Sequence, residues 1–284
     1  MDVETVDGSD AFLERAGALL GADEARHNLA FGILSTARAH PELYPELRGW
    51  VAWDAGTAAG AALRTPPFNL VVVQPTDERA LDALAVAIDD ALPGVVGAVP
   101  EVDVLAAAWA GRRGVRLETR FEQGVYALRR VRRARPAPGT MRLAVAEDRP
   151  LLLEWVDAFA KEALHHGPEA DRARHEGSVD SRLTGGDAGF ALWEVDGRPV
   201  SLVGFGGPTP NGIRIGPVYT PPEQRGHGYA SALTARVSQL QLDRGRRFCF
   251  LYTDLGNPTS NAIYARIGYE RVCDSREVAF VPAT

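Results

Sequence analysis

The chain has 284 residues, of which 45% are hydrophobic and 24% are charged, with a net charge of −6. This composition is that of an ordinary globular protein and excludes a disordered or fibrous chain, while the acidic balance argues against a nucleic-acid-binding surface. The length exceeds that of one compact domain, so two domains are expected.

The sequence shows no membrane-spanning or secretory signal. No run of about 18 apolar residues occurs, and the N-terminal MDVETVDGSD is acidic rather than a basic region leading into an apolar core. The cysteines are Cys249 and Cys273, which support neither a disulfide framework nor a cysteine-based zinc site. We therefore expect a cytoplasmic protein with two reduced thiols and no membrane partner.

The first half of the chain predicts an α/β unit. GWVAWDAG, residues 49–56, is an alternating strand that ends in a glycine turn. NLVVV follows as a strand, and DERALDALAVAIDDAL as a helix with Leu81, Leu84 and Ile88 on one face. Only Gln-Pro-Thr separates this strand from the helix region, so no glycine-rich turn precedes the helix.

The segment RRVRRARPAPG, residues 129–139, predicts a boundary. Pro136, Pro138 and Gly139 prevent a continuing helix or a paired central strand. No aromatic residue is interleaved with the arginines, so we interpret the segment as a solvated linker rather than a phosphate-binding patch.

The second half repeats the order of the first. GFALWEVDG, residues 189–197, resembles GWVAWDAG, and the strand IRIGPVY is followed by a helix with Ala230, Leu233, Val237 and Leu240 on one face. A duplicated α/β unit is the economical account. Within IRIGPVY a Gly-Pro pair interrupts the strand, which predicts broken or bulged pairing and backbone groups available to a ligand.

The turn between this strand and helix reads RGHGYA, residues 225–230. The first turn of a helix leaves N–H groups without intrahelical partners and attracts anions. Gly226 and Gly228 would let the backbone approach a phosphate, and Arg225 adds a positive charge. A lone Gly-x-Gly is also common in ordinary turns. Since Walker A and dinucleotide-binding patterns are absent, a phosphate site beside an open strand edge suits coenzyme A, which carries a pyrophosphate and an amide-bearing arm.

A second cluster follows in LGNPTSNAIYARIGY, residues 255–269. Asn257 is a good N-cap, and Gly268 closes the predicted helix. Asn261 and Tyr264 lie on one helix face, while two isoleucines lie on another. Taken separately, Asn257 could be only a cap and Tyr264 only a half-buried aromatic residue.

Together, these segments resemble the GCN5-related N-acetyltransferase (GNAT) superfamily. RGHGYA fits its R/Q-x-x-G-x-G/A acyl-CoA motif, the preceding VYTPPEQ fits its strand and loop, and NPTSNAIYARIGY fits its N-P-x-S-N-x-x-Y-x-x-x-G-F/Y helix. The resemblance covers residues 141–284 as a catalytic domain. Residues 1–135 look like a degenerate copy, with residues 136–140 as the linker. The implied fold is α/β (α+β), with a mixed, mostly antiparallel twisted sheet flanked by helices, present twice.

The resemblance also implies roles for individual residues. Backbone groups of Val218, Tyr219 and Thr220 would hold the pantetheine arm. Asn257 and Asn261 would contact the cofactor, and Tyr264 would stand near its sulfur. The residues whose backbone amides would wrap the pyrophosphate are Arg225, Gly226, His227, Gly228, Tyr229, Ala230 and Ser231.

The implied function is an acetyl-CoA-dependent N-acetyltransferase in which a neutral primary amine attacks the thioester, with no metal. Tyr264 would act as a donor to the departing thiolate, and the Tyr219 N–H would meet charge on the carbonyl oxygen. The acceptor is an amine-bearing small molecule or peptide, and the protein a monomer or homodimer. The alternative is a coenzyme A-binding sensor or interaction protein that has lost turnover.

The base that removes a proton from the amine is not assigned. The candidates are Glu162, His165, His166 and Glu169 in EALHHGPEA, and Glu194 on the GFALWEV strand. The two histidines are adjacent rather than helically spaced, so a metal pair is not expected and surface placement is the alternative. His227 is interpreted as a phosphate-loop residue rather than a base.

Overall fold

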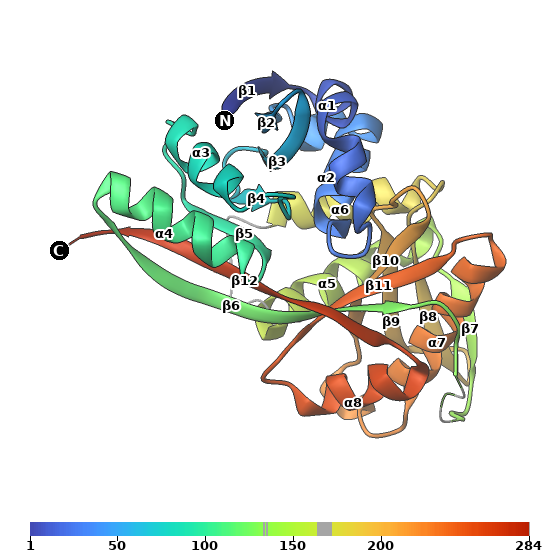
Figure 1. The fold of residues 1–284 in the computed structure, drawn as a ribbon. Helices are drawn as coiled ribbons and strands as arrows, with labels where there is room; N and C mark the ends of the chain where they lie inside the picture. The colour runs from blue at the N-terminus through green and yellow to red at the C-terminus, as the bar shows by residue number, and fades with distance from the viewer. Residues whose placement is uncertain (133, 135, 164–171, 284) are drawn as a thin grey trace. The chain divides into compact units, whose positions relative to one another are not determined.

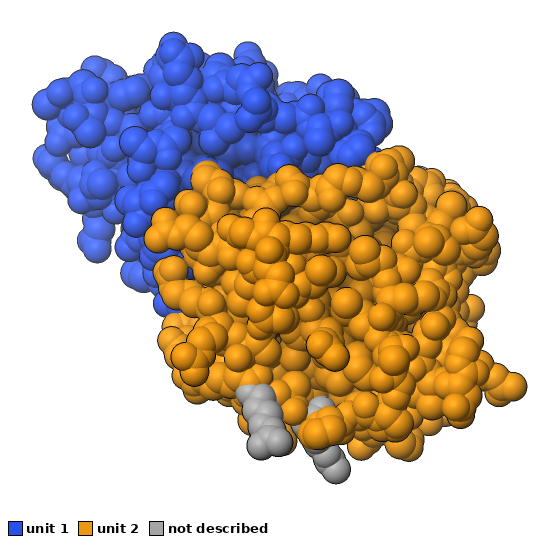
Figure 2. Space-filling view, turned by 90° about the vertical axis from the view of Figure 1, so that its right-hand side faces the viewer, with its two compact units in different colours: residues 1–125, 272–284 blue, residues 126–271 orange. Residues whose placement is uncertain are grey.

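The computed structural model describes residues 1–132, 134, 136–163 and 172–283, and the chain divides into two compact units (Figure 2). Unit 1 comprises residues 1–125 and 272–284, and unit 2 comprises residues 126–271. In each unit, helices flank a mostly antiparallel β-sheet (Figure 1). The expected fold class, present twice, is therefore confirmed.

In unit 1, neighbouring strands are antiparallel except for β4 and β5, which run parallel. The strand order is β1 (Asp2–Asp7), β2 (Arg48–Asp54), β3 (Thr57–Arg64), β4 (Leu70–Val72), β5 (Gly94–Ala98) and β12 (Glu270–Pro282). The helices are α1 (Ser9–Ala22), α2 (Asn28–Ala39), α3 (Arg79–Ala87) and α4 (Glu101–Arg113). A long strand, β6 (Val115–Leu128), crosses the boundary between the units near its C-terminal end.

Helices cover both faces of the unit 1 sheet because its strands are apolar on both sides. Alternate residues of the strands join two separate clusters, one with α3 and α4 and the other with α1 and α2. The first cluster contains Leu81, Leu84 and Ile88, each at most 1% exposed. The predicted apolar face of this helix region is therefore confirmed.

Unit 2 is built in the same way. From the end of β6 its strand order continues with β11 (Phe248–Asp254), β10 (Gly212–Tyr219), β9 (Arg198–Gly206), β8 (Gly189–Val195) and β7 (Thr140–Leu143). The helices are α5 (Arg149–Ala163), α6 (Arg172–Leu183), α7 (Tyr229–Asp243) and α8 (Pro258–Ile267). One core cluster holds α7 and α8, with Leu233 and Val237 fully buried as predicted, and another holds α5 and α6.

Two local features show that the halves are copies of one plan. The hairpin β2–β3 turns through Ala55 and Gly56, and the hairpin β8–β9 turns through Asp196 and Gly197. All of these residues have positive φ, which is the requirement of the tight type I′ turn. In both units the parallel strand pair comes next along the chain.

The structure divides the chain at a different place from the predicted linker. Residues 275–279 of β12 pair with β5, so the C-terminal strand belongs to unit 1 rather than to the range 141–284. The described residues of the segment 129–139 are mostly exposed, as expected of a solvated segment, but two of their main-chain groups also bond to unit 2. The Arg132 N–H donates to the Ile267 carbonyl at 2.6 Å, and the Trp193 indole N–H donates to the Pro138 carbonyl at 2.7 Å.

Both cysteines carry free thiols, as the sequence predicted. Burial raises the pKa of Cys249 to about 12 and that of Cys273 to about 11. No helix in the described parts of the chain is long and apolar enough to cross a membrane.

Gly268, which ends α8, cannot be replaced without strain, because its backbone has positive φ and a Cβ would have no room. Its φ is +115°, and a Cβ there would lie 2.8 Å from the Arg130 carbonyl oxygen, whereas Gly197 has φ +72° and no atom within 4 Å of such a Cβ. Both Gly→Ala changes force a left-handed residue, at a cost of about 1–2 kcal/mol. We predict that Gly268→Ala lowers the free energy of unfolding by about 1 kcal/mol more than Gly197→Ala, measured by calorimetry. Equal losses would contradict this account.

Candidate functional site

The two parallel strands of unit 2 separate part of the way along their length. β10 pairs with β11 over residues 212–214, and in the described residues no pairing between them follows, although β10 continues to Tyr219. On its other side β10 pairs with β9, with a register shift between Ile215 and Val218. The irregularity predicted inside IRIGPVY is confirmed, and one edge of β10 is open where the strand ends.

The last residues of β10 point to opposite faces of the sheet. Val218 packs against the cluster of α7 and α8, whereas Tyr219 belongs to the cluster of α5 and α6, with its ring centroid 6.1 Å from that of Trp155. Burial, together with the negative charge of Glu162, raises the pKa of Tyr219. The strand end is therefore fixed from both sides.

A serine that sequence reasoning missed holds the end of β10. Ser201 on β9 is completely buried; its hydroxyl donates to the Tyr219 carbonyl at 3.1 Å and lies 2.8 Å from the Thr220 hydroxyl. Ser201 could have been found in the sequence as the one hydroxyl within the apolar strand VSLVGFG. A hydroxyl buried in such a strand requires a hydrogen-bond partner nearby.

The turn from β10 to α7 presents unpaired main-chain donors. Gly226 and Gly228 have φ of +83° and +85°, and no side chain caps α7. Among the described residues no acceptor is found for the N–H groups from Gly226 to Ser231, and the first helical bond runs from the Ala232 N–H to the Gly228 carbonyl at 3.0 Å. These donors lie in the positive field of a helix N-terminus, which can hold an anion.

In unit 1 the corresponding helix start is that of α3, and there a carboxylate of the chain itself accepts a main-chain N–H group. At the start of α3 the Arg79 N–H donates to Asp77 Oδ1 at 2.9 Å, and the Arg79 guanidinium also pairs with Asp77. These contacts, the side-chain pair first, lower the pKa of Asp77. The anion position of unit 1 is therefore already occupied, in agreement with its lack of a glycine-rich turn.

Arg225 stands beside the glycine turn and contacts three neighbours. Its Nη2 lies 2.6 Å from Glu162 Oε2, its Nε donates to the Thr220 carbonyl at 2.9 Å, and its guanidinium carbon lies 6.0 Å from the centroid of the Tyr219 ring. The ion pair is half exposed and contributes little to stability. Its effect is to hold a positive charge at the end of β10.

His227 is an exposed residue of the same turn. Its ring stacks on Tyr229 with centroids 5.3 Å apart and planes 13° apart, and Nδ1 lies 3.3 Å from the Gln224 carbonyl oxygen. The ring therefore packs along the first residue of α7.

Tyr264 is more buried than the sequence indicated. It is 9% exposed and belongs to the core cluster of α7 and α8, which also contains Tyr229 and Tyr269. Burial raises the pKa of Tyr264 to about 12. The hydroxyl of Tyr269 lies 2.8 Å from Ser238 Oγ, whereas that of Tyr264 makes no hydrogen bond to another described residue. Tyr264 is therefore a protonated hydroxyl with its donor unused.

The two asparagines of α8 shape the start of that helix. Asn257 Oδ1 accepts the Ser260 N–H at 3.0 Å, which confirms the predicted N-cap. The Asn261 side-chain amide donates to the carbonyl of Asp254 at 3.2 Å and contacts that of Leu255 at 3.5 Å. The Asn257 side chain therefore caps α8, and the Asn261 side chain joins α8 to the end of β11.

The two described carboxylates proposed as bases are paired with arginines. Glu162 pairs with Arg225, and Glu194 Oε1 accepts from Arg142 Nε at 2.7 Å. His165, His166 and Glu169 lie outside the described residues. Sequence reasoning did not single out His175 on α6, whose Nδ1 lies 2.5 Å from Asp157 Oδ1 on α5; the two residues are far apart in sequence, so only the packing of the helices reveals the pair.

Comparison with known proteins agrees with this geometry. The Acetyltransferase (GNAT) family matches residues 151–269, a stretch that contains β10, the glycine turn, α7 and α8. Residues 151–269 are therefore a GNAT-family domain. No curated protein sequence matches the chain.

Solved structures extend the likeness of fold to the whole chain. A Drosophila protein has a TM-score of 0.72 at 12% identity, with 99% of both chains covered. A tandem GNAT protein from the clavulanic acid biosynthesis pathway has a TM-score of 0.57 at 17% identity, with 100% of both covered. A GCN5-related N-acetyltransferase from Sphaerobacter thermophilus has a TM-score of 0.57 at 20% identity, covering 99% of this chain and 96% of its own. Family and fold support acyl-CoA-dependent acyltransferase activity in general terms.

The cap at Asn257 gives a prediction for α8. Asn257→Ala removes the acceptor of the Ser260 N–H and is expected to lower the free energy of unfolding by about 1 kcal/mol. The neighbouring Thr259→Ala changes an exposed side chain and should change it by less than about 0.5 kcal/mol. Calorimetric unfolding of both variants checks this, and a loss at Thr259 as large as that at Asn257 would remove the cap from the account.

Proposed function

We propose that unit 2 is an acetyl-CoA-dependent N-acetyltransferase that moves an acetyl group to the primary amine of a small molecule or peptide. The observation that carries the proposal is the run of unpaired N–H groups from Gly226 to Ser231, at the end of the open strand edge of β10. A diphosphate supplies several acceptor oxygens and negative charge, which is what these donors and Arg225 require.

The residues around the turn fit the other parts of the cosubstrate. A Cβ placed on Gly226 would meet no atom within 4 Å, so the space beside the turn is open. The open edge of β10 at Val218, Tyr219 and Thr220 can hydrogen-bond the amides of a pantetheine arm, as a sheet edge pairs with an extended peptide. Asn257 and Asn261 would contact the cofactor from the start of α8.

The proposed acetyl transfer uses two hydrogen-bond donors of the protein, one on Tyr219 and one on Tyr264. Acetyl-CoA, when bound, supplies the acetyl group as a thioester. A neutral amine nitrogen attacks the carbonyl carbon, so that a C–N bond forms, the C–S bond breaks, and the amine proton passes to solvent or a base. The Tyr219 N–H would stabilise negative charge on the carbonyl oxygen. Tyr264 would donate a hydrogen bond to the thiolate, since its raised pKa keeps the hydroxyl protonated.

One observation favours a second function. Both described carboxylates considered as bases, Glu162 and Glu194, are ion-paired with arginines, so their oxygens already have partners within the protein. A coenzyme A-binding sensor without turnover is therefore the alternative. Thiol release from acetyl-CoA across a panel of primary amines separates the two, because an enzyme releases thiol with some amine and a sensor binds without release.

The diphosphate site is tested at Gly226. A valine there would cover the main-chain donors and would strain the turn, because Gly226 has positive φ. Gly226→Val should therefore weaken acetyl-CoA binding at least about tenfold in titration calorimetry. Gly185→Val is the matched control, because Gly185 also has positive φ and no atom within 4 Å of a Cβ. Its affinity should stay within about twofold of the parent. Parent-like affinity in Gly226→Val would contradict the proposed site.

The pKa of Tyr264 sets a pH signature for its role. With its pKa raised to about 12, the hydroxyl remains a donor throughout neutral and moderately alkaline pH, and this contribution is lost only as the pH rises through about 12. Tyr264→Phe should lower kcat about tenfold or more, by the same factor at pH 7 and pH 10. An ordinary tyrosine, with a pKa near 10, would lose half its effect at the upper pH.

The control for this prediction is Tyr269→Phe, which removes a buried hydroxyl of the same cluster that already pairs with Ser238. It should reduce stability but leave kcat within about twofold. Equal effects of the two substitutions on kcat would assign Tyr264 a packing role only.

A further inference from the structure

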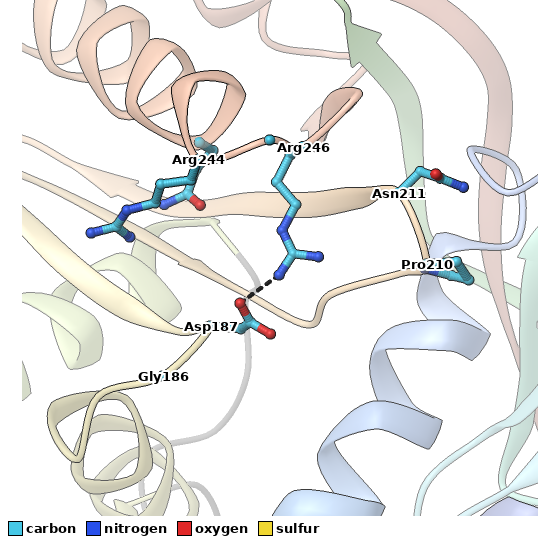
Figure 3. A pocket seen from close by; sticks show the side chains of 8 residues that line it. Gly186, Asp187, Pro210, Asn211, Arg244 and Arg246 are labelled. Atoms are coloured by element: carbon cyan, nitrogen blue, oxygen red, sulfur yellow. Dashed lines mark hydrogen bonds and ion pairs between the residues drawn. The ribbon is translucent and has the colours of Figure 1, made fainter.

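A surface hollow of about 260 Å³ lies in unit 2 at the C-terminal end of α7 (Figure 3). Three turns form its walls: Gly186 and Asp187 before β8, Pro210 and Asn211 before β10, and Gly245 and Arg246 after α7. The glycine turn that precedes α7 is at the other end of this helix. Since α7 has 15 residues, the two places are about 20 Å apart.

Main-chain hydrogen bonds fix these walls. The Arg246 N–H donates to the Gln241 carbonyl at 3.1 Å, and the Arg247 N–H donates to the Asn211 carbonyl at 2.7 Å. Gly245 has φ +94°, which turns the chain sharply at the end of α7. Main-chain contacts therefore hold the turn after α7 and the turn before β10 in place.

The hollow contains more donors than acceptors. The Arg246 side chain is 19% exposed and pairs with Asp187 Oδ1 through Nη2 at 2.5 Å, as the dashed line in Figure 3 marks. A guanidinium has five N–H groups, and no other side-chain or carbonyl acceptor for Arg246 is found among the described residues. Gln241, which also lines the hollow, is 2% exposed, and its Nε2 is buried without a partner. Buried donors without acceptors are unfavourable.

The charged side chains that line the hollow give it a net positive charge, which also favours an anion. Arg244 adds a second guanidinium at the rim, pointing away from Arg246 (Figure 3), while Asp187 supplies one carboxylate. The C-terminus of a helix carries about half a negative charge. The two guanidinium groups outweigh that dipole and Asp187 together.

We propose that this hollow binds the phosphate or carboxylate group of a small molecule. Arg246 supplies the main charged contact through N–H groups that Asp187 leaves unused, and Arg244 provides a second charge from the rim. The Gln241 amide supplies a further donor once the ligand draws it outward. The site is separate from the diphosphate site proposed above and does not depend on it.

The test uses inorganic phosphate and acetate as separate probes on the full chain. ¹H–¹⁵N spectra would follow the Arg246 Nε–H and the Gln241 side-chain amide during each titration. Saturable shifts of these groups with phosphate assign a phosphate site, and shifts with acetate assign a carboxylate site. No saturable shift with either anion overturns the proposal.

Three variants make the test specific. Arg246→Met should weaken binding of whichever anion, phosphate or acetate, gives saturable shifts, by at least about tenfold. Arg247 is an exposed neighbour with the same charge, and Arg247→Met should change this binding less than about twofold. Asp187→Asn removes the competing carboxylate while retaining the side-chain shape, and should strengthen binding several-fold. Equal weakening by both arginine variants would show general charge attraction instead of a built site and overturn the proposal. Weaker binding in Asp187→Asn would also overturn it, because Asp187 would then position Arg246 for the anion and not compete with the anion for it.

Discussion

The separation of β10 from β11 is the constraint on which the candidate site depends. The strands pair over residues 212–214, and β10 then continues alone to Tyr219 on that edge. A register shift against β9 and the buried hydroxyl of Ser201 hold the strand in this position. Since the strand leads directly into the glycine turn, one backbone path presents both an open sheet edge and a set of unpaired N–H groups. A ligand with amides at one end and phosphates at the other fits that path.

The comparison of the two halves shows how little must change to remove such a site. Both halves have the same hairpin turn and the same parallel strand pair. In unit 1, however, Asp77 accepts the Arg79 N–H at the start of α3 and pairs with the Arg79 side chain, whereas Gly226 and Gly228 leave the start of α7 open. The unpaired N–H groups of a helix N-terminus can be satisfied either by a carboxylate of the chain itself or by the phosphate of a ligand. The fold is therefore duplicated, whereas the described residues leave the helix start open in unit 2 and not in unit 1.

Much of this could be predicted from the sequence, because the relevant signals are local. The apolar face of α3, the interruption inside IRIGPVY and the cap at Asn257 depend on residues close together in the chain, and each is confirmed. The membership of β12 in unit 1 could not be predicted, because strand pairing across the length of the chain has no local signature. The same holds for the pairing of Glu162 with Arg225 and for the depth at which Tyr264 is buried, which depend on how helices pack.

Hydrogen–deuterium exchange of the full chain, with and without coenzyme A, tests the central claim most directly. If the main-chain donors at the start of α7 hold the diphosphate, the amides from Gly226 to Ser231 should exchange markedly more slowly when the ligand is present. The amides at the start of α3, where Asp77 already occupies the position, should be unchanged. Binding of coenzyme A that leaves exchange at residues 226–231 unaltered would contradict the account.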